Sequence, residues 1–353
     1  MINKQIIPRT ILPRGFWLLG GRGLRAVVLL TLLCGTIQPL SAQNLFTRVD
    51  SFLTKNYRKV RYDTTYMARP QQKWVLIARF NLSGVSIMTE GVDQSALPPG
   101  SSSEGAHFKS RMKAQNKTTL TLGVGYQGIV LSLALNPARL AGKYRDYEFN
   151  LNCYRRNLGC DVIYSDAKNF TGWYDQEGMP RIEMPEGILH VQTLNLNGHY
   201  VFNHRRFSYP AAFSQSYIQH RSAGSFLLAA SCMAQIARLE TEQPLKMKVV
   251  NVGIGGGYGY NYVPRRGWLL HLSLLPTIIP YSYSSLTEGE VRKKDLYRFP
   301  EFIVTARSSV VYHWRNKFLG ISMVYNYTNM GDKDDFAVYN SKWRLRAFFG
   351  LRI

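Results

Sequence analysis

The chain has 353 residues and a formal net charge of +22, from 44 Lys and Arg against 22 Asp and Glu. Beyond residue 42 no run of about 18 apolar residues occurs, so the sequence predicts no transmembrane helix, although 22 Tyr, 17 Phe and 6 Trp make it strongly aromatic. The four cysteines lack metal-ligand spacing, and we expect neither a metal nor another cofactor.

Residues 1–42 have the three parts of a cleaved secretory signal peptide. Five Lys and Arg residues precede the apolar run Ala26–Cys34, and small residues lead to an expected cut before Gln43. Removal of this segment leaves 39 Lys and Arg against 22 acids. A basic surplus often indicates nucleic-acid binding, but an exported protein rarely meets nucleic acid. We expect the basic surplus to face anionic lipopolysaccharide or phospholipid headgroups, or to line a channel.

Residues 43–72 form a leader before the first strand. Leu45, Val49, Phe52 and Leu53 recur at helical spacing, which predicts a short periplasmic helix or a lid on the inner mouth of a barrel. A disordered leader is the alternative.

From residue 73 to residue 353 an apolar–polar alternation of period two dominates. In residues 249–262 the even positions are mostly apolar or aromatic, whereas the odd positions are mostly Gly and Asn. A face of bare glycines suits a barrel interior that backbone or a plug approaches closely. The predicted fold is therefore an all-β, antiparallel transmembrane β-barrel of about 12 strands (10–14). A soluble periplasmic β-sandwich is the alternative. The expected strands are 74–84, 118–126, 128–136, 145–154, 158–166, 188–202, 222–237, 248–262, 267–281, 299–314, 317–328 and 342–353.

The connections between these strands alternate in length, as they do in outer-membrane barrels. Short inner turns are predicted at 127, 155–157, 263–266 and 315–316, with residues 203–221 as the one long exception. Gly123, Gly125 and Gly128 match the G-x-G-x-x-G fingerprint of dinucleotide sites, which requires a helix after the turn. A strand follows here, so we interpret these glycines as part of an inner hairpin. The long outer connections are 85–117, 137–144, 167–187, 238–247, 282–298 and 329–341.

Three segments resemble a known family. They are the run Phe202–Gln215, the run Gln219–Ser225 and the opening Tyr62–Trp74. Together they resemble an uncharacterised Bacteroidota family known as domain of unknown function 4421, from Tyr62 to the C-terminus. The resemblance implies association with the outer membrane and supplies no catalytic residues.

The inner connection 203–221 is the first candidate for function because it is long, basic and aromatic. Arg205 and Arg206 stand beside Phe207 in it, followed by Tyr209 and Phe213. It predicts a plug or constriction in the lumen, or a docking surface for a periplasmic partner. The alternative is a structural cap on the inner mouth.

Two His-x-Ser pairs are candidates for catalysis. His220 with Ser222, and His271 with Ser273, each share one face of an extended chain, so each His lies within reach of its Ser as a base. Outer-membrane phospholipases and lipid A deacylases use similar pairs, but on the lipid side and with a third orienting group. Here the apolar neighbours of His271 place it in the lumen, and the spacing indicates no third group.

The polar face of the strands carries Arg79, Arg307, Arg344, Arg346 and Arg352, with Asp146, Glu148 and Glu301 among the acids. Ion pairs that make the lumen rigid are the favoured interpretation. Selection of anions by an open pore is the alternative.

Cys153 and Cys160 flank a turn centred on residues 156 and 157. A hairpin symmetric about that turn places them opposite each other, and an oxidising compartment would permit a disulfide.

We therefore predict a monomeric, porin-like outer-membrane barrel of a Gram-negative bacterium. Its role is a narrow channel or a structural envelope protein rather than an enzyme. A lipid or lipopolysaccharide acyl hydrolase and a periplasmic interaction module are the alternatives. The expected partners are outer-membrane lipid and the outer-membrane insertion machinery.

Overall fold

The computed structural model describes residues 62–93, 105–126, 129–135, 146–240, 244–288, 291–294, 301–332 and 336–353, together with residues 47, 48 and 51. The predicted signal peptide and most of the predicted leader helix lie outside these residues; residues 47, 48 and 51 are helical. No helix in the described ranges is both long enough and apolar enough to cross a bilayer. The chain divides into two units at residue 59, and the second unit is described below.

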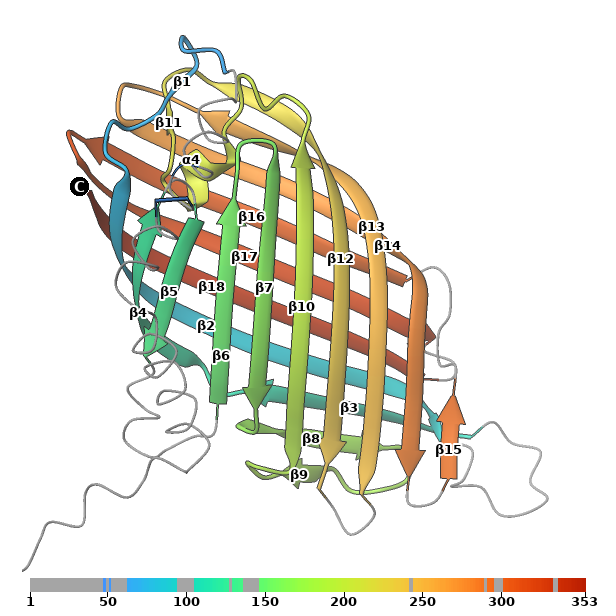
Figure 1. The fold of residues 1–353 in the computed structure, drawn as a ribbon. Coiled ribbons are helices and arrows are strands. Elements are labelled where there is room, and N and C mark those ends of the chain that lie inside the picture. Colours follow the sequence, from blue (N-terminus) through green and yellow to red (C-terminus); the bar gives the residue numbers. More distant parts are fainter. Residues whose placement is uncertain are drawn as a thin grey trace, which may run out of the picture. The chain divides into compact units, whose positions relative to one another are not determined.

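Twelve antiparallel strands of this second unit form a closed barrel (Figure 1). The last strand pairs with the first along its length, from Phe336 opposite Gly91 to Arg352 opposite Val75. The predicted all-β barrel of about twelve strands is thus confirmed. The strands are β2 (Trp74–Asp93), β4 (Lys117–Tyr126), β5 (Ile129–Leu135), β6 (Asp146–Tyr154), β7 (Leu158–Ala167), β10 (Leu189–Val201), β12 (Ala223–Leu239), β13 (Leu245–Tyr262), β14 (Trp268–Glu288), β16 (Glu301–Trp314), β17 (Lys317–Asp332) and β18 (Phe336–Arg352).

The outward face of the barrel is apolar. In β4, Leu120, Leu122 and Val124 are exposed, whereas Thr119 and Thr121 are buried inside. The same alternation recurs around the barrel, with exposed large apolar side chains on both β10 and β14. A soluble sandwich would bury this face, whereas a transmembrane barrel presents it to lipid. The fold is therefore that of a transmembrane β-barrel.

Four shorter strands extend the sheet at the outer end, where the sequence predicted loops. They are β3 (Ala106–Ala114), β8 (Phe170–Gln176), β9 (Ile182–Met184) and β15 (Val291–Lys294). The inner half of β2 pairs with β4, and its outer half pairs with β3 instead. In β3 the alternation is reversed rather than lost: Lys109 and Arg111 are exposed, whereas Met112 is buried. A strand that extends beyond the bilayer presents its outward face to water instead of lipid, so polar residues lie outside there.

The inner turns at 155–157, 263–267 and 315–316 are short, as predicted. Residues 127 and 128 lie outside the described ranges, but Tyr126 pairs directly with Ile129. Strand therefore follows strand at Gly123 and Gly125, and the fingerprint belongs to a hairpin. The described residues that follow, 129–135, form a strand and not a helix that could offer its N-terminus to a phosphate.

The connection from β10 to β12 turns back into the barrel. It forms α4 (Tyr209–Phe213), all of whose residues are buried, and β11 (Ile218–Gln219), which pairs with β1 (Met67–Ala68). Ser208 starts α4 because its Oγ accepts a hydrogen bond from the Ala211 amide at 3.2 Å. We call residues 207–219 the inner plug. Gly259 leaves room for it: a Cβ there would lie 3.1 Å from the Phe207 ring.

The interior near the outer end is apolar rather than polar. Nine buried side chains from strands all round the barrel pack together there and narrow the lumen. They are Ile87, Met112, Phe170, Leu189, Val191, Met233, Val249, Met330 and Val338. We call them the outer apolar cluster.

Candidate binding site in the barrel lumen

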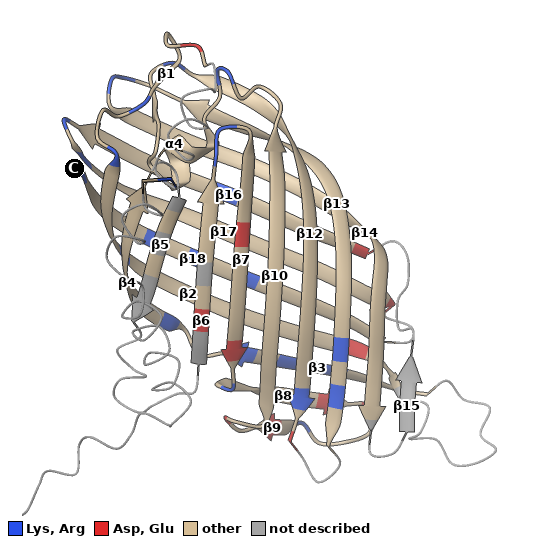
Figure 2. Ribbon diagram, viewed as in Figure 1, with Lys and Arg blue, Asp and Glu red and all other residues tan. Residues whose placement is uncertain are grey.

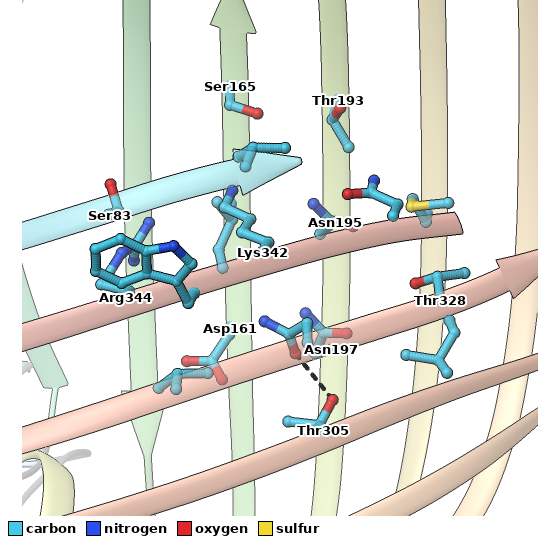
Figure 3. Close-up of a pocket in the computed structure, with 18 of the residues that line it drawn as sticks. Ser83, Asp161, Ser165, Thr193, Asn195, Asn197, Thr305, Thr328, Lys342 and Arg344 are labelled. Atoms are coloured by element: carbon cyan, nitrogen blue, oxygen red, sulfur yellow. Dashed lines mark hydrogen bonds between the residues drawn. The ribbon is translucent and has the colours of Figure 1, made fainter. Parts of the chain in front are cut away.

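A cavity of about 220 Å³ lies inside the barrel between the inner plug and the outer apolar cluster. Tyr209 and Phe213 of the plug line it at one end, and Phe170 and Met233 line it at the other. Figure 3 shows hydroxyl and amide side chains of opposite walls pointing into it. The charged lining residues are five cations (Lys117, Arg307, Lys342, Arg344 and Arg346) and two acids (Glu148 and Asp161).

Both acids of the cavity are paired. Glu148 accepts a hydrogen bond from Arg344, and its other oxygen lies 3.8 Å from the Lys117 ammonium. Asp161 lies 3.2 Å from Arg307 Nη2 and also accepts hydrogen bonds from the Tyr154 hydroxyl and the Asn152 amide. These contacts fit the interpretation of the lumenal charges as ion pairs. Asp161 was not singled out in the sequence, because one acid in an alternating strand is unremarkable until its partner is known.

Two further lumenal arginines are held by neutral groups. Arg79 Nη1 donates to Ser132 Oγ at 2.7 Å, and Arg346 Nε donates to Asn81 Oδ1 at 2.9 Å. Neither of them has a carboxylate partner among the residues that the structure describes. The cavity wall that the structure describes therefore carries more cations than acids, and a surplus of one sign in a cleft attracts ions of the other sign.

The other three predicted lumenal arginines lie elsewhere. Arg352 is buried at the plug, where its Nη2 donates to the Gln215 carbonyl at 3.1 Å and lies 3.1 Å from His313 Nδ1. Arg205 and Arg206 are exposed at the inner end and do not line the lumen, which corrects the prediction. The chain enters the barrel only after them, because the buried residues begin with Phe207.

The His271 pair forms a three-residue relay. His271 Nε2 lies 3.0 Å from Ser273 Oγ, and Nδ1 lies 2.7 Å from Asn261 Oδ1 on β13. The register places Asn261 directly opposite His271 on the neighbouring strand. Sequence spacing missed this third group because ten residues and a turn separate the two positions.

The His220 pair is not assembled. Ser222 Oγ accepts a hydrogen bond from the Val263 amide, and the backbone N–H of His220 donates to the Tyr66 carbonyl. No side-chain contact between His220 and Ser222 is found in this described segment. Burial, and then nearby Arg266, lower the pKa of His220.

The inner plug covers the relay. Ser273 is 1% exposed, and the rings of Tyr209 and Phe213 lie 5.3 and 5.0 Å from the His271 ring. Asn261 Nδ2 also donates to the Ser208 carbonyl at 2.9 Å. In this conformation the relay therefore fastens the plug to the barrel wall.

Cys153 and Cys160 are direct cross-strand partners, but both are free thiols, so the predicted disulfide is absent. The Cβ atoms of directly opposed residues lie about 4.5–5.5 Å apart, which is longer than the roughly 3.5–4.5 Å that a disulfide favours.

A family model described as Domain of unknown function (DUF4421) matches residues 61–352. The chain belongs to this family. A search of curated proteins finds no match. Solved structures with a similar fold include the outer-membrane protease OmpT from Escherichia coli, at 9% identity and a TM-score of 0.42, covering 80% of this chain and 97% of that one. OprG from Pseudomonas aeruginosa matches at 10% identity and a TM-score of 0.28, covering 79% and 96%. These low values transfer no activity to this chain.

Proposed function

We propose that the protein is an outer-membrane channel of a Gram-negative bacterium that binds a small anionic solute in its lumen. On this proposal the signal peptide is removed on export. The inner plug blocks release to the periplasm until it moves, so the channel is gated rather than open.

The cavity carries this proposal. Its lining has five cations and two acids, and the acids are already paired within the wall. The remaining positive charge favours a carboxylate or phosphate, because such groups accept charge-assisted hydrogen bonds from guanidinium groups. Asn195, Asn197, Thr193 and Thr305 offer further hydrogen bonds, which suit the hydroxyl groups of a sugar acid (Figure 3).

Planar-bilayer conductance tests the proposal. We expect few conductance steps from the whole protein, and frequent anion-selective steps once residues 207–217 are replaced by a Gly-Ser linker. A matched control replaces the exposed outer residues 178–181 in the same way and should conduct like the unaltered protein. Arg346→Gln in the plug-less barrel should reduce the preference for anions. A plug-less barrel that folds but conducts no better than the whole protein would refute the gate.

A second candidate is acyl-ester hydrolysis, favoured by the relay of Ser273, His271 and Asn261. His271 would accept the Ser273 proton as Oγ attacks the ester carbonyl, with Asn261 orienting the ring. The burial of Ser273 requires the plug to leave first, so we rank this function below the channel.

A fluorophosphonate probe tests hydrolysis. The relay predicts labelling of Ser273 in the plug-less barrel, lost in Ser273→Ala and retained in Ser222→Ala. Absence of labelling in the plug-less barrel, with unchanged membrane lipids, would remove this candidate.

We further propose a monomer that the outer-membrane insertion machinery assembles and that lies against outer-membrane lipid and lipopolysaccharide. A periplasmic partner at 203–221 would contact the ends of that segment, because its middle is buried.

A further inference from the structure

The inner end of the barrel is strongly basic. Figure 2 shows Lys and Arg gathered where β1, α4 and the C-terminus lie. The segments described there are 62–73, 155–157, 202–222, 263–267 and 315–316, and their only acidic side chain is Asp63. Their nine arginines are Arg69, Arg155, Arg156, Arg205, Arg206, Arg221, Arg265, Arg266 and Arg315.

Arg156 differs from the others because it is buried. It lies in the tight turn between β6 and β7 and is 8% exposed, and its Nε and Nη1 have no hydrogen-bond partner. No ion pair with Arg156 or Arg205 is found in the described part of the chain. A buried guanidinium with unsatisfied donors is costly unless an anion accompanies it.

The groups around Arg156 increase this cost. Burial lowers its pKa, and Arg69 and Arg205 are near enough to lower it as well, although Tyr217 opposes them. Arg69 is held in place because its Nε donates to the Tyr217 hydroxyl at 3.2 Å and its guanidinium lies 4.9 Å from the Tyr62 ring centroid. Three positive groups from three separate segments therefore converge on one place.

This place adjoins the lipid-facing side of the barrel. The turn that holds Arg156 adjoins Tyr200, because the Val201 amide donates to the Asn157 carbonyl at 2.8 Å. The centroid of the Tyr200 ring lies 5.1 Å from that of Phe202 and 6.4 Å from that of His204. Phe202 is 57% exposed on the outward face, where Leu194 and Leu196 of the same strand are also exposed. Aromatic rings at the end of an apolar face mark the level of the lipid headgroups.

We propose that Arg156, with Arg205 and Arg69, binds the phosphate of an anionic phospholipid in the inner leaflet. The guanidinium fork of Arg156 matches two phosphate oxygens, and Tyr200 and Phe202 contact the adjoining glycerol and acyl chains. Arg205 is exposed, so its side chain can turn aside to admit the headgroup. This site lies outside the lumen and does not depend on the proposed channel.

Lipid binding to the whole protein tests this site. Native mass spectrometry in detergent would compare the retention of phosphatidylglycerol and phosphatidylcholine. We expect preferential retention of phosphatidylglycerol. In Arg156→Gln the affinity for phosphatidylglycerol should fall by a factor of about ten, because charge-assisted hydrogen bonds are lost. Arg155→Gln is the matched control: it removes the same charge from the same turn, but at an exposed side chain, and should bind as before.

Three outcomes would overturn the proposal. One is that Arg155→Gln and Arg156→Gln weaken phosphatidylglycerol binding equally, which would indicate diffuse attraction of the lipid by the basic surface. Another is equal retention of both lipids. The third is competition by inorganic phosphate at the concentration at which the lipid binds, which would indicate a site for soluble phosphate. If Arg156→Gln loses the heat-modifiable gel mobility of a folded barrel, Arg205→Gln at the exposed partner takes its place and should weaken phosphatidylglycerol binding.

Discussion

The two ends of the barrel interior are closed by different means. At the inner end a folded segment of the chain enters the lumen and is held by polar contacts, including those of Asn261 with Ser208 and of Arg352 with Gln215. At the outer end apolar side chains of the walls themselves meet. A segment held by hydrogen bonds exchanges them readily for water or ligand, whereas a packed apolar cluster separates only by exposing its surface.

The charges at the two ends also differ. The described segments of the inner end have nine arginines against one aspartate. The outer end instead mixes both signs in pairs such as Lys109 with Glu90 and Lys168 with Glu240. A paired surface neutralises itself, but a surface of one sign requires external anions. The inner end is therefore where we expect the molecule to meet external anions.

The largest expected effect comes from the buried ion pair beside the plug. Arg307→Leu leaves Asp161 buried without its cation and should lower the free energy of unfolding by about 3–5 kcal/mol. Urea unfolding of both proteins in lipid vesicles measures this difference in unfolding free energy. Adding Asp161→Asn should recover part of the loss. An equal loss in the single and double variants would mean that the pair itself contributes little.

Phe170→Ala tests the outer apolar cluster. Phe170 is 2% exposed, so its loss should cost about 3 kcal/mol of unfolding free energy through lost burial and a cavity. Met179→Ala, in the exposed outer connection, is the control and should have little effect. If the Phe170 variant instead raised conductance without loss of stability, the cluster would be a gate rather than a packed closure.

Ser208→Ala removes the N-cap of α4 and should destabilise the folded plug by about 1 kcal/mol. The loss should fall on the plug, so protease sensitivity of 207–219 should rise while the unfolding of the barrel changes little. Unchanged sensitivity would show that the other contacts of the plug, such as those of Asn261 with Ser208 and of Arg352 with Gln215, are sufficient to hold it.

Lys109→Ala should have the smallest effect. Its ammonium is exposed and lies 3.8 Å from the half-buried Glu90 carboxylate. We therefore expect a loss of less than about 1 kcal/mol of unfolding free energy, which falls further at high salt. A larger loss would show that outer pairs act as a network.

Much of the barrel could be read from the sequence. Alternation located twelve strands to within a few residues in the membrane-spanning part, because lipid outside and polar groups inside impose one period on every strand. It failed for β3 and β8, where water reaches the outward face. The candidate site was only partly predictable: the lumenal arginines followed from the alternation, but their partners Asp161 and Asn81 did not.

The sequence alone determined the class of fold, a strand number of about twelve and the face of the lumenal side chains on the strands, because these depend on local period. Only the tertiary structure decided what those side chains meet. Strand register brings Asn261 to His271, closure of the sheet brings Arg307 to Asp161, and the return of 207–219 into the lumen turns a basic aromatic loop into a plug. Such contacts join residues that are distant in the chain. The local sequence pattern does not specify which distant residue a given side chain will contact.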